Sequence, residues 1–175
     1  MKLTATYIRA AITEWLRYEK GMYLIAWERG FGGYRTPDVL AVGKNRHLHE
    51  VEIKVSWSDY LRDFEKRHRS YNPHYLYYAA PPSLAARIAA HPAHPVGVGV
   101  LTFIESRRLS IAGFHKVVSI KPSAMQRTAR PMTMLQMARM ARNQAGTLVS
   151  LARAHHLAKC GHCGCDEHFD DGEGI

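Results

Sequence analysis

Apolar and polar positions follow a helical rhythm at the start of the chain and a strand-like rhythm after it. Near the start, apolar residues recur at spacings of three and four: Ile8, Ala11, Ile12, Trp15 and Leu16. This spacing predicts a helix over residues 3–20, ended by Gly21. Three apolar runs then follow at residues 22–27, 38–42 and 47–55. Their β-branched and aromatic residues predict three strands.

The third of these runs alternates between two kinds of side chain. Because side chains in a strand point to opposite faces in turn, one face carries Leu48, Glu50, Glu52 and Lys54. The other face carries His49, Val51, Ile53 and Val55. Polar and charged residues therefore share the first face with only one apolar residue.

The remaining chain predicts further alternation of helices and strands. An amphipathic helix follows residue 55, a strand covers 75–80, and a short alanine-rich helix covers 82–90. Two strands at 96–104 and 109–114 are expected to form a hairpin around the charged residues 105–108. Methionine-rich helical spacing is expected from residue 123, interrupted by Pro131, and a last helix over 147–159.

Three charged residues are predicted to meet where the second and third strands pair. A hairpin joining these strands places Asp38 beside Glu52 and Lys54. Two carboxylates and an amine suit Mg²⁺ or Mn²⁺, which take oxygen ligands and keep waters. A water between the metal and Lys54 could then attack a phosphodiester. The alternative is a structural one, in which Asp38 caps a turn and Glu52 and Lys54 form an ordinary exposed pair.

These residues resemble the PD-(D/E)xK nuclease superfamily. Pro37-Asp38 corresponds to the PD and Glu52-Ile53-Lys54 to the ExK. Over residues 20–82 the chain is similar to the MmcB-type DNA-repair nucleases of that superfamily, on the following residues: 52–56 (EIKVS), Asp59, Asp63, Lys66, Tyr71 and 75–81 (YLYYAAP). Arg35 and Glu28 also stand where such proteins carry an arginine and an acid.

The resemblance implies a metal-dependent DNA endonuclease. It implies an α/β fold with a restriction-endonuclease-like core of helix, three strands, helix and strand, in which helices flank a mixed sheet. Asp38 and Glu52 would bind the metal, Lys54 would act on water, and Glu28 would complete the site. We expect a nuclease-like domain over residues 1–120, a helical extension over 121–159 and a tail over 160–175. Glu14 or Glu19 could add a further ligand, although a solvated glutamate is the simpler interpretation of each.

The charge of the chain fits a nucleic-acid partner. Its formal net charge is +9 and its pI about 9.7, which indicates a polyanionic ligand, DNA being the simplest. Arg62 and Lys66, on the charged face of the helix after residue 55, are candidates for phosphate contacts. Arg35, from the loop at residues 30–35, is a third candidate. No apolar run is long enough to span a membrane. We therefore expect a cytoplasmic protein, and a homodimer if both strands of a duplex are cut.

Residues 160–168 of the tail offer four types of metal-ligand side chain, and the candidate zinc ligands among them are Cys160, Cys163, Cys165 and His168. Cys160 and Cys163 match one half of a zinc site, and Cys165 with His168 or His156 could complete a tetrahedron. The alternatives are a reduced tail without metal and, less simply, a redox motif. A zinc-dependent interaction protein is accordingly one competing hypothesis. The other is a nucleic-acid-binding module that keeps the nuclease scaffold without turnover.

Overall fold

The computed structural model describes residues 3–27, 37–65, 73–110 and 113–145. Its elements in chain order are α1 (Ala5–Glu14), a π-helix (Trp15–Glu19), β1 (Leu24–Trp27), β2 (Val39–Val42), β3 (Leu48–Ile53), α2 (Trp57–Glu65), β4 (Tyr75–Ala79), α3 (Pro82–Ala89), β5 (Gly99–Ser110) and β6 (Gly113–Lys121). A further helix occupies residues 134–145. None of the helices in these ranges combines the length and the apolar character that crossing a lipid bilayer requires.

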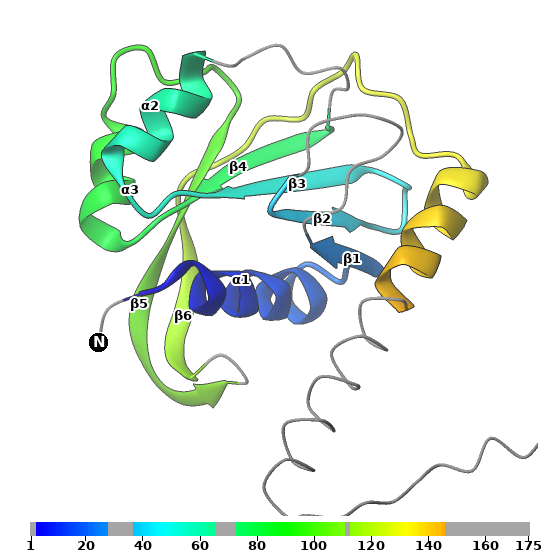
Figure 1. Ribbon diagram of the computed structural model, residues 1–175, viewed down its shortest axis with the longest axis horizontal. Helices are drawn as coiled ribbons and strands as arrows, with labels where there is room; N and C mark the ends of the chain where they lie inside the picture. The colour runs from blue at the N-terminus through cyan, green and yellow to red at the C-terminus, as the bar shows by residue number, and fades with distance from the viewer. Residues whose placement is uncertain (1–2, 28–36, 66–72, 111–112, 146–175) are drawn as a thin grey trace, which may run out of the picture.

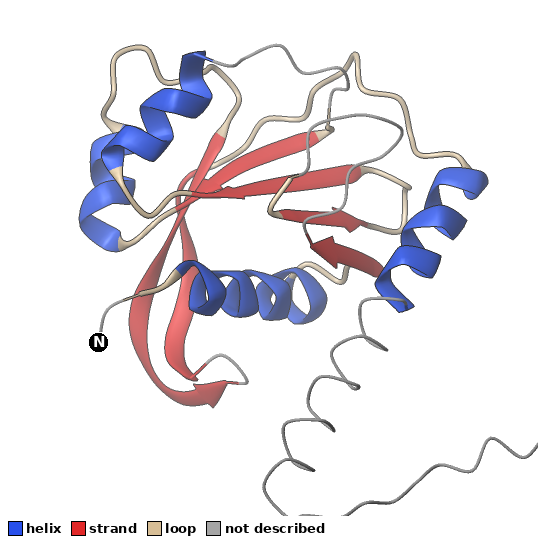
Figure 2. Ribbon diagram, viewed as in Figure 1, coloured by secondary structure: helices blue, strands red, loops and turns tan. Residues whose placement is uncertain are grey.

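The strands form one mixed sheet in the order β1-β2-β3-β4-β5-β6. The pairs β1–β2, β2–β3 and β5–β6 are antiparallel, whereas β3–β4 and β4–β5 are parallel. The α2 and α3 helices are the crossovers that the two parallel pairs require. The expectation of an α/β fold with a mixed sheet and flanking helices is therefore confirmed, and helices lie on both faces of the sheet (Figures 1 and 2).

Alternation along the strands gives the sheet two differently covered faces. Odd-numbered residues of β2, β3 and β4, such as Val39, Val51 and Tyr77, pack against the apolar stripe of α1. The side-chain oxygen of Thr4 accepts a hydrogen bond from the backbone N–H of Tyr7 and caps this helix. Even-numbered residues face the other side. There the sheet meets α2 and α3 at one end and the 134–145 helix at the other (Figure 1).

Two predicted boundaries are wrong. The turn expected at residues 105–108 lies within a strand, because β5 continues to Ser110 and β6 runs on to Lys121. Ile104 and Glu105 are exposed, and Glu105 pairs with His115 of β6. Glu105, the first of the residues that suggested a turn, lies instead on an exposed part of β5.

The helix expected from residue 123 begins only at residue 134. The preceding segment binds the body of the domain through its backbone. Backbone N–H groups of Ala124, Gln126 and Met132 donate to carbonyl oxygens of Gly97, His74 and Arg46, respectively, at 2.8–3.0 Å. These bonds to three distant loops replace the hydrogen bonds that a helix would make. The expected helix over 147–159 lies outside the described residues.

Aromatic and histidine rings stack on one another near the start of β3 and β4. The ring of His49 stacks on Tyr75 with centroids 4.4 Å apart, and His47 stacks on His74 at 4.3 Å. Burial, together with the nearby charges of His47, His74 and Lys20, lowers the pKa of His49 to about 4. His49 is therefore neutral in the folded protein near pH 7.

The low pKa of His49 predicts a loss of stability in mild acid. Between about pH 6.5 and pH 4 the unfolded chain binds a proton at His49 more readily than the folded protein does. Stability should therefore fall as the pH drops through this window, by about 3 kcal/mol from this residue alone. Urea unfolding of the wild type and of His49→Gln at pH 7 and pH 4.5 measures it. The variant should lose distinctly less stability, and an equal loss would contradict the assignment to His49.

Candidate active site

The sheet register brings Asp38 and Glu52 together. In the β2–β3 pair, Val39 lies opposite Val51 and Leu40 opposite Glu50, so the same register places Asp38 opposite Glu52. Opposed residues of antiparallel strands point to the same face of the sheet. Asp38 is fixed in this position because its Oδ2 accepts a hydrogen bond of 2.7 Å from the backbone N–H of Ile53. The predicted convergence at the start of β2 is thus observed.

Lys54 completes the cluster as the partner of Glu52. Its Nζ lies 3.4 Å from Glu52 Oε2, and both side chains are only 3% exposed. The backbone N–H of Lys54 donates to the carbonyl oxygen of Ala79 at the end of β4, 2.9 Å away. The pair therefore sits at the carboxyl ends of two parallel strands, where ligand sites of open α/β sheets form. The alternative interpretation, in which Glu52 and Lys54 form an ordinary exposed pair, is therefore wrong.

The cluster interrupts an otherwise apolar layer. On its face of the sheet, one apolar cluster covers β4 and β5 beneath α2 and α3, and includes Tyr60, Leu76 and Tyr78. Another covers β1 and β2 beneath the 134–145 helix, and includes Leu40 and Met140. Glu50 and Glu52 of β3 lie between them and are buried. Burying charged groups is costly unless they are paired or serve a purpose that compensates for it.

Asp38 is the most accessible of the three charged residues, being partly rather than fully buried. Burial raises the pKa of its carboxyl group above the ordinary value, and the hydrogen bond from Ile53 lowers it in part. Repulsion from Glu52 raises this pKa further, while Lys54 and Arg9 lower it. Four charged groups from α1, β2 and β3 therefore act on one another at this point of the sheet.

The two carboxylates form a donor set suited to a hard divalent cation. Mg²⁺ is commonly held by one or two carboxylates together with waters and a substrate phosphate. The mutual repulsion that raises the pKa of Asp38 is the kind of interaction that a cation between the carboxylates would relieve. Within the described ranges, groups of three or more His, Cys, Asp or Glu arranged to hold a metal are absent. A metal site with only two carboxylate ligands from the protein is compatible with the repulsion at Asp38 and with the absence of a larger ligand group in the described ranges.

The other predicted site residues are placed only in part. Arg62 of α2 is exposed, and its Nη2 lies 3.5 Å from Asp59 Oδ1. Glu14 ends α1, where its charge contributes to the raised pKa of Tyr7, and Glu19 is exposed at the end of the π-helix. Seven predicted ligands or contact residues lie outside the described residues: Glu28, Arg35 and Lys66, and the tail residues Cys160, Cys163, Cys165 and His168.

Two neighbours of the site were missed from the sequence. Arg9 of α1 acts electrostatically on Asp38, and the ring of Tyr78 lies 5.9 Å from Lys54 Nζ. Arg9 directly follows Ile8 of the buried stripe, so its place at the edge of the helix–sheet contact could have been noticed. Tyr78 lies opposite Glu52 in the parallel β3–β4 pair. Finding it required the register between strands that are distant in sequence.

Comparison with known proteins adds information about the fold alone. No protein-family model matches the sequence, and no curated protein matches it. Among solved structures, a protein of unknown function from Silicibacter pomeroyi is similar, with a TM-score of 0.58 and 16% sequence identity. The alignment covers 89% of this chain and 94% of that one. The α/β architecture is thus shared over nearly the full length of both chains.

Proposed function

We propose that the protein is a metal-dependent DNA nuclease whose α/β core is of the restriction-endonuclease type. The observation that carries the proposal is the placement of Asp38 opposite Glu52, with Lys54 paired to Glu52 at the same strand end. The order helix, three strands, helix and strand matches the core expected from the resemblance to PD-(D/E)xK nucleases. Hydrolysis of a phosphodiester bond, in repair or processing of DNA, is the activity that these groups suit.

The proposal assigns a distinct task to each charged residue. Asp38 and Glu52 would hold Mg²⁺ or Mn²⁺, and Glu28 would add a third acid. When bound, such an ion supplies a Lewis acid and lowers the pKa of coordinated water. The Lys54 ammonium would orient the attacking water by a hydrogen bond and offset the negative charge that develops on the phosphate. The hydrogen bond from Ile53 would keep the Asp38 carboxylate aimed at the site.

Two features support DNA as the substrate. The net charge of +9 favours association with a polyanion. Arg62 presents an exposed guanidinium on α2, the helix that follows Lys54 after two residues, where it could contact the DNA backbone. Arg35 and Lys66 are proposed as further phosphate contacts. A homodimer would supply the second site needed to cut both strands of a duplex, and zinc at Cys160, Cys163, Cys165 and His168 stays a separate proposal.

Cleavage by wild type and by Lys54→Met tests the proposal. Labelled duplex, single-stranded, flapped and branched DNA are incubated with Mg²⁺ or Mn²⁺. Methionine keeps the length of the Lys54 side chain and removes its ammonium. We expect the wild type to cut at least one substrate and Lys54→Met to cut it at least about a hundredfold more slowly.

Lys116→Met is the matched control, because Lys116 is an exposed lysine of β6, outside the cluster. It should cut like the wild type. Binding of these DNAs by the wild type without cutting in either metal would support the inactive nucleic-acid-binding module instead. Cutting that survives Lys54→Met in a correctly folded variant would remove Lys54 from the chemistry.

A further inference from the structure

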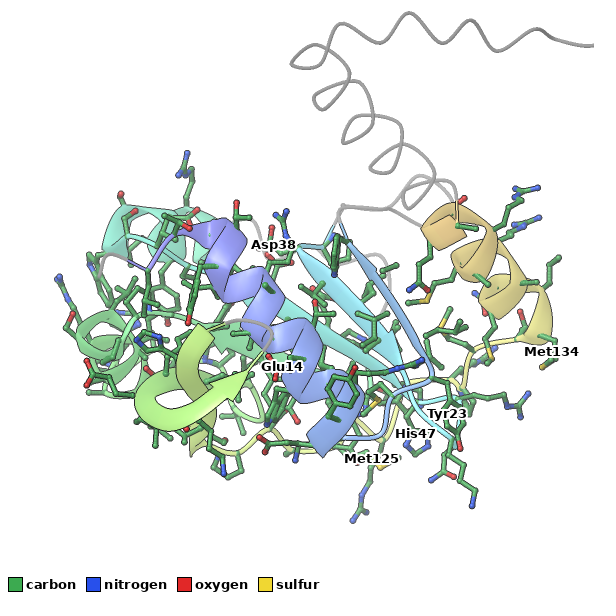
Figure 3. The ribbon with its side chains drawn as sticks, turned by 90° about the horizontal axis from the view of Figure 1, so that it is seen from below. Glu14, Tyr23, Asp38, His47, Met125 and Met134 are labelled. Carbon is green, nitrogen blue, oxygen red and sulfur yellow. The ribbon has the colours of Figure 1, made fainter. Side chains whose placement is uncertain are left out.

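A separate cavity lies at the opposite end of the β2–β3 pair from Asp38. Its volume is about 580 Å³, within the range of small-molecule sites, and it is lined in part by Gly43, His47 and His49. Figure 3 shows Asp38 and His47 at opposite ends of these strands. His49 also faces α1, whereas Glu52 and Lys54 lie on the other face of the sheet. The cavity is therefore distinct from the carboxylate cluster.

Aromatic rings form one part of the cavity lining. Trp15 of the π-helix, His49 of β3 and the tyrosines Tyr75 and Tyr77 of β4 all contribute. The planes of His49 and Tyr77 are within 9° of parallel, and Tyr75 is tilted by 23° from His49. Trp15 meets Tyr77 edge to face, with centroids 5.9 Å apart. Such a surface suits a planar aromatic ligand, because stacking on aromatic side chains is favourable for any base.

Positively charged side chains form another part of the cavity lining. Lys20 and Lys44 line the cavity and are exposed, whereas none of the described residues that line it is acidic. Lys20 Nζ lies 5.0 Å from the centre of the Trp15 ring, so its charge is held next to the aromatic surface. Two ammonium groups beside an aromatic wall select a ligand that combines a flat ring with an anionic group.

We propose that this cavity binds a nucleotide, with the base against the aromatic rings and His49, and the phosphate at Lys20 and Lys44. The ligand chemistry is the same in a free mononucleotide and in an unpaired nucleotide of a strand. The site does not depend on the nuclease proposal, because it shares no residue with the carboxylate cluster.

Calorimetric titration tests the proposal on the full chain, in EDTA so that DNA is not cut. The probes are adenosine 5′-monophosphate, adenosine, inorganic phosphate and a 5′-phosphorylated octathymidylate. Adenosine 5′-monophosphate should bind at one site, at least about tenfold more tightly than adenosine or phosphate alone. The double variant Lys20→Ala/Lys44→Ala should bind it at least about tenfold more weakly than the wild type does. Both lysines are exposed, so their replacement leaves the core intact.

The charge-matched control is Lys116→Ala/Arg139→Ala, which removes two exposed cations that do not line the cavity. It should bind adenosine 5′-monophosphate like the wild type. If the oligonucleotide binds more tightly than adenosine 5′-monophosphate and the Lys20/Lys44 variant weakens that binding, the natural ligand is a nucleotide within a strand. If the oligonucleotide binds more weakly, the natural ligand is a free nucleotide. Absence of binding by adenosine 5′-monophosphate, or equal affinity of the Lys20/Lys44 variant, would overturn the proposal. Asp38→Asn should leave this binding unchanged whether or not the protein is a nuclease.

Discussion

Replacement of Asp38 by asparagine is expected to remove nearly all DNA cleavage and to raise the stability of the metal-free protein. Both effects follow from removing the negative charge of Asp38, which would bind the metal and which is disfavoured in the metal-free fold. Burial and repulsion from Glu52 raise the pKa of the Asp38 carboxyl group, so its ionised form is disfavoured in the folded state. A folded-state pKa above the unfolded value means that stability is lost as the pH rises through that pKa. At pH 7 the wild type therefore carries this cost.

Asparagine keeps an oxygen that can accept the hydrogen bond from Ile53 and removes the charge. We therefore expect a higher unfolding midpoint in EDTA and a fall in cleavage rate of at least about a hundredfold, with DNA binding retained. Asp59→Asn is a suitable control, since Asp59 is a carboxylate of α2 outside the cluster. A variant that keeps wild-type cleavage would contradict the role of Asp38. Lower stability in EDTA would contradict the assigned cause.

The second large effect concerns the buried pair of Glu52 and Lys54. Removing one charge leaves the other buried without this partner, which typically costs about 3–5 kcal/mol. Lys54→Met and Glu52→Gln should each lower the unfolding free energy by an amount of this order. The double variant should lose less than the sum of the two, because it buries neither charge.

The exposed pair of Asp59 and Arg62 provides a matched comparison. Its atoms are 3.5 Å apart, nearly the same distance as the 3.4 Å between Lys54 and Glu52, but the side chains of Arg62 and Asp59 are 63% and 29% exposed. Breaking it should change stability by less than about 1 kcal/mol. Urea unfolding of both sets of single and double variants measures the two coupling energies. Similar small values for both pairs would mean that Glu52 and Lys54 are not buried as a pair in solution.

The sequence predicted the part of the fold that local patterns determine. The apolar stripe of α1 marks the face of that helix that packs on the sheet, and alternation separates the two faces of β3; both elements were found as expected. The spacing between Asp38 and Glu52 also sufficed to predict their meeting, because a hairpin fixes register over a short stretch of chain. The burial of Glu52 and Lys54 was missed, since it depends on helices that come later in the sequence.

The errors lie where distant contacts override local preference. Methionine spacing favoured a helix from residue 123, but backbone bonds to three loops hold the segment in another conformation. The extension of β5 past Glu105 depends on pairing with β6, which a charge pattern does not reveal. The cavity beside His49 combines the π-helix, β3 and β4, so no single stretch of sequence indicates it.

The most direct measurement is cleavage of 5′-labelled DNA by the wild-type protein in Mg²⁺, in Mn²⁺ and in EDTA. The nuclease proposal predicts labelled fragments in at least one metal and none in EDTA, on at least one of the duplex, single-stranded, flapped or branched substrates. DNA that is bound but stays intact at every metal concentration would contradict it. The cluster of Asp38, Glu52 and Lys54 would then belong to a binding module without turnover.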